Sequence, residues 1–309
     1  MKASPLCPAV QNTTMPDISI IIVNYNTADY LSACLTSILS QSAGIHLEIA
    51  VVDNASQDDS VSLVRNQFQQ VHLIASRENL GFSKANNLAT NLTNAKYIYY
   101  LNPDTEVKPK CLEAVYAFME NSPTVGMAGT RITYPDNTPQ GSVETKYPGQ
   151  KHCTNEVKGL PGHIAWLLGA SLVARREVIE QVGGFTEDFF LYGEDIDLGL
   201  KIRQAGWKLG FIPDAEIVHW EGKSERNTLP VELFHKKLMA EALFYKKHYH
   251  RKTITNICQA NIKQALWRIA TLHLEMFLFK DPCSLQNKLD RYRLSLAFFR
   301  KLAIETQHS

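Results

Sequence analysis

The chain has 309 residues, of which 45% are hydrophobic and 20% are charged. This composition supports a large buried core and argues against a chain that is disordered throughout. The formal net charge of +1 conceals an asymmetry, because residues 1–220 carry a net charge of −7 and residues 221–309 a net charge of +8. A basic segment of this kind suggests contact with an anionic surface, although a solvated basic face has the same composition.

Six cysteines are spread along the chain, and none forms a CxxC pair with another. A disulfide framework and a zinc site are therefore poor interpretations, and a reducing compartment is the better one. The cysteines are Cys7, Cys34, Cys111, Cys153, Cys258 and Cys283. The N-terminus lacks the apolar core of a signal peptide, and no apolar run approaches the ~20 residues that cross a bilayer. We expect a cytoplasmic protein, free or attached to the inner face of the cell membrane, with no nucleic-acid partner.

Strands and helices alternate through the first 121 residues, after a proline-containing leader at residues 1–17 that we expect to be disordered. Short apolar runs predict buried strands at residues 18–23, 47–52, 71–75 and 95–101. Apolar spacing and capping residues predict helices at residues 27–40, 58–68, 83–91 and 110–121. The alternation predicts an α/β fold in which a mainly parallel sheet is flanked by helices on both faces.

The second half of the chain is less regular at first and then helical. Residues 126–160 are rich in glycine, proline and polar residues, and we expect them to be irregular. A strand is predicted at residues 167–175 and a helix at residues 196–205, and the chain is expected to be helical from about Glu232 to its end. We therefore divide the chain into the leader, an α/β domain at residues 18–225 and a helical, basic extension at residues 226–309.

Polar side chains follow two of the predicted strands, at the edge where parallel sheets bind ligands. Asp53 ends the second strand, and its carboxylate can accept a hydrogen bond from a base or ribose, or can form an Asx turn that caps a helix. Asn102 and Asp104 flank Pro103 after the fourth strand. They can hold Mg²⁺ or Mn²⁺ through oxygen ligands, and the alternative is an ordinary Asn-Pro turn.

Three carboxylates, Glu194, Asp195 and Asp197, stand at the start of a predicted helix. The helix dipole favours anions there, but three in four positions exceed what capping needs. Glu194 and Asp197 are three residues apart and share a face, whereas Asp195 points elsewhere. One of the three can therefore act as the general base toward a hydroxyl group. His219 follows another predicted strand and can bind a metal, although a single histidine is more often structural.

Several short motifs in a fixed order together resemble glycosyltransferase family 2, whose members are inverting enzymes with the GT-A fold. The matching strings lie at residues 20–26 (IIIVNYN), 51–56 (VVDNAS), 79–87 (NLGFSKANN), 101–104 (LNPD), 169–171 (GAS), 183–185 (GGF), 191–198 (LYGEDIDL) and 218–219 (VH). They extend over residues 18–220, about two thirds of the chain. Their combination is far more specific than any one of them.

The resemblance implies a role for each matching residue. Asp195 is implied as the catalytic base, and Asp53 as the residue that recognises the pyrimidine base of the donor. Asp104, the remaining carboxylate of the family's DxD motif, and His219 are implied as ligands of a divalent metal, Mg²⁺ or Mn²⁺. Asn102 stands where that motif has its first carboxylate. The further donor-binding residues implied are Asn24, Asn26, Asn79, Gly81, Lys84, Asn102, Gly169, Ala170 and Glu194.

Within the family, the strings at residues 51–56 and 79–82 resemble bacterial rhamnosyltransferases of surface-polysaccharide and lipopolysaccharide synthesis. This implies transfer of rhamnose, with inversion, from dTDP-rhamnose to a hydroxyl group of a saccharide or lipid-linked acceptor. The alternatives are another donor, such as a UDP-sugar, and a nucleotide-sugar-binding protein without catalysis, which the intact Asp104 and Asp195 argue against. A nucleotidyltransferase or a dinucleotide-binding enzyme would need a glycine-rich signature after the first strand, where Asn24-Tyr25-Asn26-Thr27 stands instead.

The predicted extension places apolar residues at helical spacing among basic ones. The apolar residues are Leu266, Ile269, Leu272, Met276, Phe279, Leu294, Leu296, Phe298 and Phe299. Such helices can lie in the headgroup region of an anionic membrane, which would bring the protein to a lipid-linked acceptor. The alternative is that this face packs on the α/β domain or on a second subunit in a homodimer.

Overall fold

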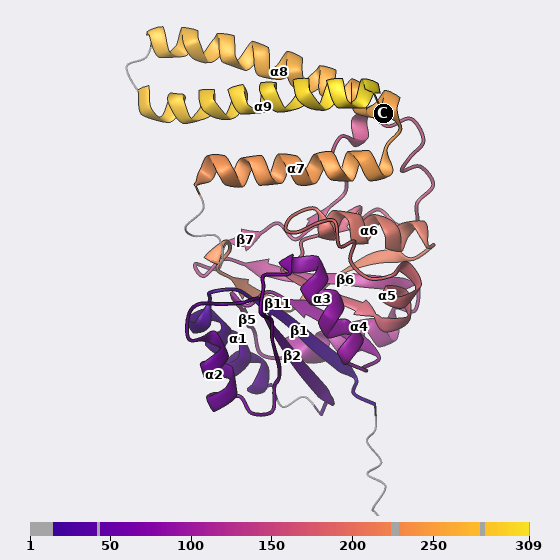
Figure 1. Cartoon of the computed structure of the whole chain (residues 1–309). Coiled ribbons are helices and arrows are strands. Elements are labelled where there is room, and N and C mark those ends of the chain that lie inside the picture. The colour runs from indigo at the N-terminus through magenta and orange to yellow at the C-terminus, as the bar shows by residue number, and fades with distance from the viewer. Residues whose placement is uncertain (1–14, 42–43, 224–228, 279–281, 309) are drawn as a thin grey trace, which may run out of the picture.

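The computed structural model describes residues 15–41, 44–223, 229–278 and 282–308 (Figure 1). An α/β part is built around a curved sheet, and helix α7 (Pro230–His248) lies across it. Helices α8 (Arg251–Leu278) and α9 (Pro282–His308) form a hairpin on the outer side of α7. All but the last three residues of the predicted leader lie outside the described residues. The carbonyls of Pro16 and Asp17 accept the N–H groups of Lys96 and Tyr97, where strand β4 (Tyr97–Leu101) begins.

Strands β1 to β4 form the parallel half of the main sheet, whose order is β3-β2-β1-β4-β10-β6-β11-β5. Their bounds are β1 Ile18–Asn24, β2 Leu47–Asp53, β3 His72–Ala75 and β4 Tyr97–Leu101. β1 lies between β2 and β4 and is buried along its whole length, which accounts for its continuous apolar run. Asn24 stands opposite Asp53, and Ile22 opposite Leu101, so the three strands end at one edge.

Antiparallel strands complete the other half, so the sheet as a whole is mixed. β10 (Ser171–Arg175) runs antiparallel to both β4 and β6 (Val125–Thr133). β11 (Lys208–His219) is parallel to β6 and antiparallel to β5 (Thr105–Val107). The short strands are β7 (Pro139–Gln140), which pairs with β6, and β8 (Val143–Glu144), which pairs with β9 (Trp166–Leu167).

Strand β6 corrects the expectation that residues 126–160 are irregular. Its glycines, which we took as signs of a loop, lie where neighbouring side chains come close. A Cβ on Gly126 would lie 2.8 Å from the Cβ of Trp207, and a Cβ on Gly129 would lie 3.1 Å from Leu167. Glycine therefore marks close packing in this strand rather than a turn.

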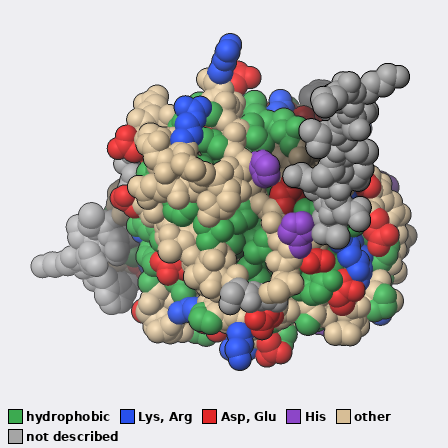
Figure 2. Space-filling model, turned by 90° about the horizontal axis from the view of Figure 1, so that it is seen from below, with side chains coloured by type: hydrophobic (Ala, Val, Ile, Leu, Met, Phe, Trp, Pro, Cys, Tyr) green, Lys and Arg blue, Asp and Glu red, His purple; other side chains and the backbone are tan. Residues whose placement is uncertain are grey.

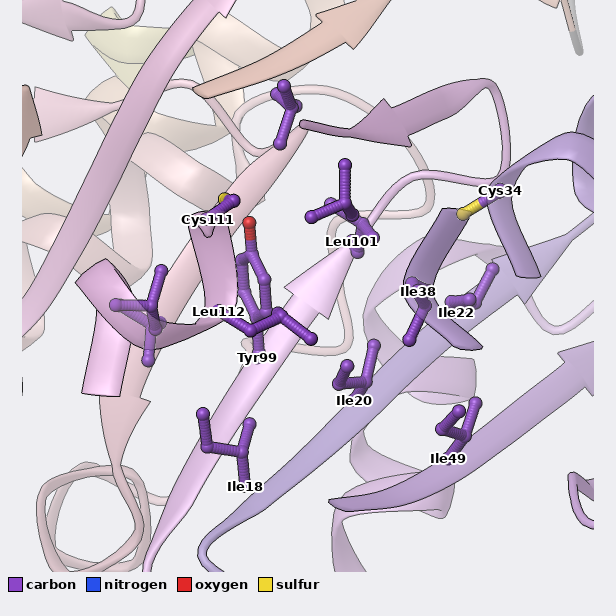
Figure 3. Close-up of a cluster of buried hydrophobic side chains, with 14 of the residues drawn as sticks. Ile18, Ile20, Ile22, Cys34, Ile38, Ile49, Tyr99, Leu101, Cys111 and Leu112 are labelled. Carbon is purple, nitrogen blue, oxygen red and sulfur yellow. The ribbon is translucent and has the colours of Figure 1, made fainter. Parts of the chain in front are cut away.

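Helices cover both faces of the sheet. On one face, Ile18, Ile20 and Tyr99 pack against Ile38 of α1 and Leu112 of α4 (Figure 3). The helices of this part are α1 Ala28–Leu39, α2 Ser60–Gln67, α3 Gly81–Leu92, α4 Cys111–Asn121, α5 Arg176–Val182 and α6 Glu194–Gln204, with a 3₁₀ helix at Gln150–His152. The predicted helices are confirmed, whereas the short helix α5 was not predicted.

Helix α7 joins the C-terminal helices to the α/β part. Phe244 of α7 is fully buried and stacks on Tyr147, with ring centroids 6.0 Å apart. The carboxylate of Asp197, on α6, is buried and lies 2.7 Å from Nε2 of His248 at the end of α7. This combination of apolar and polar contacts fixes α7 on the helix that carries the acidic cluster.

Most apolar residues of the predicted membrane face pack inside the helical extension. Leu272 and Phe299 are buried, and Ile269 and Met276 pack beside Leu272. Phe279 lies outside the described residues. Phe298 and Phe299 belong to a cluster shared with the α/β part, as the packing alternative expected, whereas Ile269, Leu272 and Met276 pack against α9 within the extension itself. Among the described residues, no helix is both long and apolar enough to cross a membrane.

The chain's positive charge is unevenly placed on the structure. Figure 2 views the α/β part from the side opposite the C-terminal helices, where acidic and basic side chains are scattered among hydrophobic and neutral ones. The net charge of +8 belongs instead to residues 221–309, which include α7, α8 and α9. The extension is therefore the basic part of the molecule.

Candidate active site

The first wall of the site forms where β1 and β2 end. Nδ2 of Asn24 donates hydrogen bonds to Oδ1 of Asp53 at 2.9 Å and to Oγ of Ser56 at 3.2 Å. The backbone N–H of Ser56 donates to Oδ2 of Asp53 at 3.0 Å, so Asp53 does hold the turn that follows its strand. Asn26 adopts a left-handed conformation, with φ at 55°, and its Oδ1 accepts the N–H of Gln57 at 2.7 Å. These bonds make the wall rigid.

The start of α3 lies beside this wall because Asn54 holds it there. Nδ2 of Asn54 donates to the carbonyl of Gly81 at 3.1 Å, and Oδ1 of Asn79 accepts the N–H of Gly81 at 2.9 Å. Gly81 has a φ of +78°, and a Cβ on it would lie 2.7 Å from Phe190, so a larger residue does not fit. Asn79 and Lys84 are exposed at the edge of this segment.

A second group forms where Asp104, just before β5, meets His219 at the end of β11. Oδ1 of Asp104 lies 3.4 Å from Nε2 of His219, and both side chains are buried. Oε1 of Gln140 lies 3.0 Å from the other ring nitrogen, Nδ1. Nε2 of Gln140 donates to Glu221 at 3.1 Å, which turns its carbonyl oxygen toward the ring. Nδ1 can therefore donate to Gln140, and this contact orients the ring so that Nε2 faces Asp104.

The third group centres on Asp195 at the start of α6. Its Oδ2 accepts the backbone N–H of Gly169 at 3.0 Å, and its Oδ1 accepts the N–H of Ile196 at 2.8 Å. The carbonyl of Ala170 in turn accepts the N–H of Asn102 at 3.0 Å. The Gly169-Ala170 pair therefore connects the Asp195 carboxylate with the turn that carries Asp104.

Burial dominates the electrostatics of the acidic cluster. It raises the pKa of Asp195 to about 6, against the opposing effect of the hydrogen bonds from Gly169 and Ile196. Burial, and after it the charge of Asp195, raises the pKa of Glu194 well above its usual range. Oε2 of Glu194 has no hydrogen-bond partner in the part of the chain that the structure describes. Burial therefore favours the protonated form of Glu194, whereas the carboxylate of Asp195 keeps two backbone hydrogen bonds and is the candidate proton acceptor.

The sequence matches the model of a known protein family. The family described as Glycosyl transferase family 2 matches residues 19–183, just over half of the chain. The chain belongs to glycosyl transferase family 2. It is a glycosyltransferase, as the order of its motifs predicted.

Two proteins similar to this family 2 member are named for rhamnosyl transfer and for O-antigen biosynthesis. The N-acetylglucosaminyl-diphospho-decaprenol L-rhamnosyltransferase of Mycobacterium tuberculosis is 27% identical over 248 residues, covering 67% of this chain and 77% of that protein. The O-antigen biosynthesis protein RfbC of Myxococcus xanthus is 27% identical over 227 residues. That match covers 68% of this chain but 18% of RfbC.

Solved glycosyltransferases share the fold of this family 2 member. The mannosyltransferase PcManGT of Pyrobaculum calidifontis, in complex with GDP-Man and Mn²⁺, has a TM-score of 0.58 at 19% identity. The match covers 96% of this chain and 88% of that one. TarS of S. aureus in complex with UDP has a TM-score of 0.54 at 13% identity, covering 94% and 91%. The predicted GT-A fold is thereby confirmed.

The structure collects the residues that the sequence singled out into three neighbouring groups, although their binding roles stay predictions. Asn54, Ser56 and Gln140 were missed. Asn54 and Ser56 belong to a motif that was noticed, and their turn-forming side chains could have been assigned to the site. Gln140 gave no signal, because it lies in the segment expected to be irregular and reaches His219 only through the pairing of β7 with β6.

The pKa of Asp195 predicts how the rate depends on pH, if this residue is the base that the resemblance implies. A base must be unprotonated, so the fraction of competent enzyme rises as pH increases through about 6 and is complete above it. We expect the initial rate of nucleoside diphosphate release to rise about tenfold per pH unit below that value and to level off above it. A rate that is constant between about pH 4.5 and 8 would contradict the assignment.

Proposed function

We propose that the protein transfers rhamnose from dTDP-rhamnose to a hydroxyl group of a lipid-linked saccharide, with inversion of the anomeric carbon. The observation that carries this proposal is Asp195, a carboxylate of raised pKa that Gly169 orients at the start of α6. The M. tuberculosis rhamnosyltransferase, 27% identical over 67% of this chain, supports the sugar and a lipid-linked acceptor. RfbC supports a place in the synthesis of a surface polysaccharide.

In the proposed step, Asp195 accepts the proton of the acceptor hydroxyl group. The hydroxyl oxygen bonds to the anomeric carbon while the bond from that carbon to the diphosphate oxygen breaks, and the nucleoside diphosphate leaves with the electron pair. The attack comes from the face opposite the leaving group, so a single displacement inverts the configuration. Burial favours the protonated form of Glu194 beside Asp195, and the N–H of Gly169 keeps the Asp195 carboxylate in place.

We assign the nucleotide of the donor to the wall at the ends of β1 and β2. Asn24 and Asp53, held by their mutual hydrogen bond, form the buried interior of this wall. Asn26, Asn79 and Lys84 stand nearer its surface. Both oxygens of Asp53 are engaged, but a carboxylate offers about four lone-pair sites. Asp53 therefore keeps lone pairs for the imide N–H of thymine or uracil, and because its side chain is buried the base would have to enter the wall to reach it.

The variant Asp195→Asn tests the function directly, because it removes the basic oxygen and keeps the shape of the side chain. We expect nucleotide binding to persist and turnover to fall roughly 10²-fold or more. Nucleoside diphosphate release would be measured with dTDP-, UDP- and GDP-sugars and a lipid-linked saccharide. Asp214→Asn, at an exposed position of β11, is the matched control and should keep wild-type turnover. Normal turnover of Asp195→Asn would show that Asp195 is not the catalytic base. A preference for a UDP-sugar would show that dTDP-rhamnose is not the donor.

We propose that Asp104 and His219 hold a divalent cation. The two side chains fit such an ion, because Nε2 of His219 and Oδ1 of Asp104 are buried and face each other 3.4 Å apart, and imidazole and carboxylate are both metal ligands. Among the described residues, no group of three or more His, Cys, Asp and Glu side chains could hold a metal, so phosphate oxygens of the donor would complete the coordination. When bound, the cation offsets the charge of the leaving diphosphate. An imidazole with a carboxylate suits Mn²⁺ better than Mg²⁺, which favours oxygen ligands.

Metal dependence is tested with a chelator and with Gln140→Leu. The chelator should abolish transfer, and Mn²⁺ should restore it more fully than Mg²⁺. Gln140→Leu removes the hydrogen bond that sets the His219 tautomer, so it should weaken Mn²⁺ binding in the presence of nucleoside diphosphate by about 10–100-fold. Gln259→Leu, at an exposed position of α8, should bind Mn²⁺ as the wild type does. Full activity in excess chelator would show that the site works without metal.

We also propose that the extension contacts the inner face of the cell membrane. After the helices have packed, Leu266, Trp267 and Leu274 of α8 remain exposed, with exposed fractions of 45%, 62% and 60%. Lys263 and Arg268 stand beside them in the sequence. An apolar surface flanked by basic residues suits the headgroup region of an anionic bilayer.

Membrane contact predicts that the protein sediments with vesicles of anionic lipid at low salt and is released at high salt, which screens the charges. Trp267→Glu should lose most of the sedimented fraction. Gln264→Glu adds the same charge at a neighbouring exposed position and should lose much less. Equal recovery in the supernatant with and without vesicles at low salt would overturn the proposal, and light scattering would then show whether this surface forms a homodimer instead.

A further inference from the structure

A hollow of about 790 Å³ lies between α7, α9 and the loop before α6, apart from the residues assigned above to donor and metal. Its walls are mainly apolar. Phe190 comes from the loop, Met239 and Leu243 come from α7, and Ala297 and Phe298 come from α9. The volume falls within the range of about 300–1,000 Å³ that is typical of ligand pockets. The hollow is therefore large enough for a substantial part of an organic ligand.

Charged side chains stand around this apolar interior, and lysines exceed carboxylates among them. The basic residues of the lining are His235, Lys236, Lys246 and Lys301. Its carboxylates are Asp188, which lies 2.5 Å from Nζ of Lys247, and Glu305, which lies 2.8 Å from Nζ of Lys246 and 4.0 Å from Nζ of Lys301. The lining therefore carries three lysines against two carboxylates. An apolar interior with such a rim is complementary to a ligand that has an apolar body and an anionic head.

The loop wall joins this hollow to the candidate active site. Phe190 lines the hollow and also lies against Gly81, and its carbonyl accepts the N–H of Phe82 at 2.8 Å. Tyr192, two residues further on, lines the hollow as well and precedes Asp195 by three residues. One short loop therefore contacts the start of α3 on the donor side, the hollow and the helix that carries the base.

We propose that this hollow binds the lipid diphosphate part of the acceptor, with the polyprenyl chain on the apolar walls and the diphosphate at the lysine rim. The proposal rests on the proposed function, which requires a lipid-linked acceptor. In this arrangement the saccharide beyond the diphosphate extends along the Phe190–Asp195 loop toward the base. A saccharide alone would lose hydrogen bonds to water against these walls, which argues against a sugar as the ligand of the hollow itself.

The test uses farnesyl diphosphate as a probe, titrated calorimetrically into the full-length protein. Inorganic diphosphate and farnesol are the comparisons for the head and the tail alone. Ala297→Trp fills the hollow from an exposed position of α9, and Met239→Glu places a carboxylate on its apolar wall. Ala270→Trp, at an exposed position of α8 outside the lining, is the matched control. Binding of dTDP or UDP is measured on every variant to show that each is folded.

We expect wild type and Ala270→Trp to bind farnesyl diphosphate more tightly than either comparison compound. Both variants of the hollow should bind it at least about tenfold more weakly, since steric filling and like charge each oppose the ligand, and should keep nucleotide affinity. Binding no tighter than that of inorganic diphosphate, or unchanged binding in both variants, would overturn the proposal.

The same variants separate this inference from the proposed function. If no nucleotide sugar serves as donor but the hollow variants still lose farnesyl diphosphate binding, the lipid site stands without rhamnosyl transfer. If transfer to a lipid-linked acceptor proceeds at the wild-type rate and KM in Ala297→Trp, the function stands and the assignment of the hollow is wrong.

Discussion

The parallel register of β1 with β2 and β4 sets the position of the polar residues at the edge of the sheet. Because Asn24 stands opposite Asp53, their side chains meet in a hydrogen bond of 2.9 Å that is closed to solvent. Because Leu101, the last residue of β4, stands opposite Ile22 near the end of β1, the turn from Asn102 to Asp104 begins at the same edge. A shift of one residue would turn these side chains to the opposite face and separate them. The buried, β-branched run of β1 is therefore a requirement of the site as well as of the core.

Helix α6 carries three carboxylates, and burial and hydrogen bonding give each of them a different environment. Asp195 accepts the N–H of Gly169 and has a pKa raised to about 6, whereas burial raises the pKa of Glu194 well above its usual range. Asp197 accepts a hydrogen bond from Oγ1 of Thr186 and lies 2.7 Å from Nε2 of His248. The helix that carries the proposed base is thereby held by α7, so the C-terminal extension supports the site as well as lining the hollow beside it.

The sequence predicted the features that depend on local pattern. The apolar runs located β1, β2 and β4, and the motif order identified the family and most of the residues that the structure brings together. Features that depend on contacts between residues distant in the chain could not be predicted from the sequence. Gly126 and Gly129 resembled loop residues because nothing nearby in sequence reveals that Trp207 and Leu167 press against them. For the same reason, the apolar faces of α8 and α9 gave no indication that they pack against each other.

The proposed reaction is a single displacement in which Asp195 accepts the proton of the acceptor hydroxyl group. Its most direct test is the configuration of the anomeric carbon in freshly formed product, read by proton NMR before any mutarotation or hydrolysis. We expect a glycoside whose anomeric configuration is opposite to that of the nucleotide sugar. A product with the donor's own configuration would contradict this mechanism. Retention requires two displacements, the first by a nucleophile of the enzyme, whereas the proposed mechanism has one displacement in which Asp195 acts as a base.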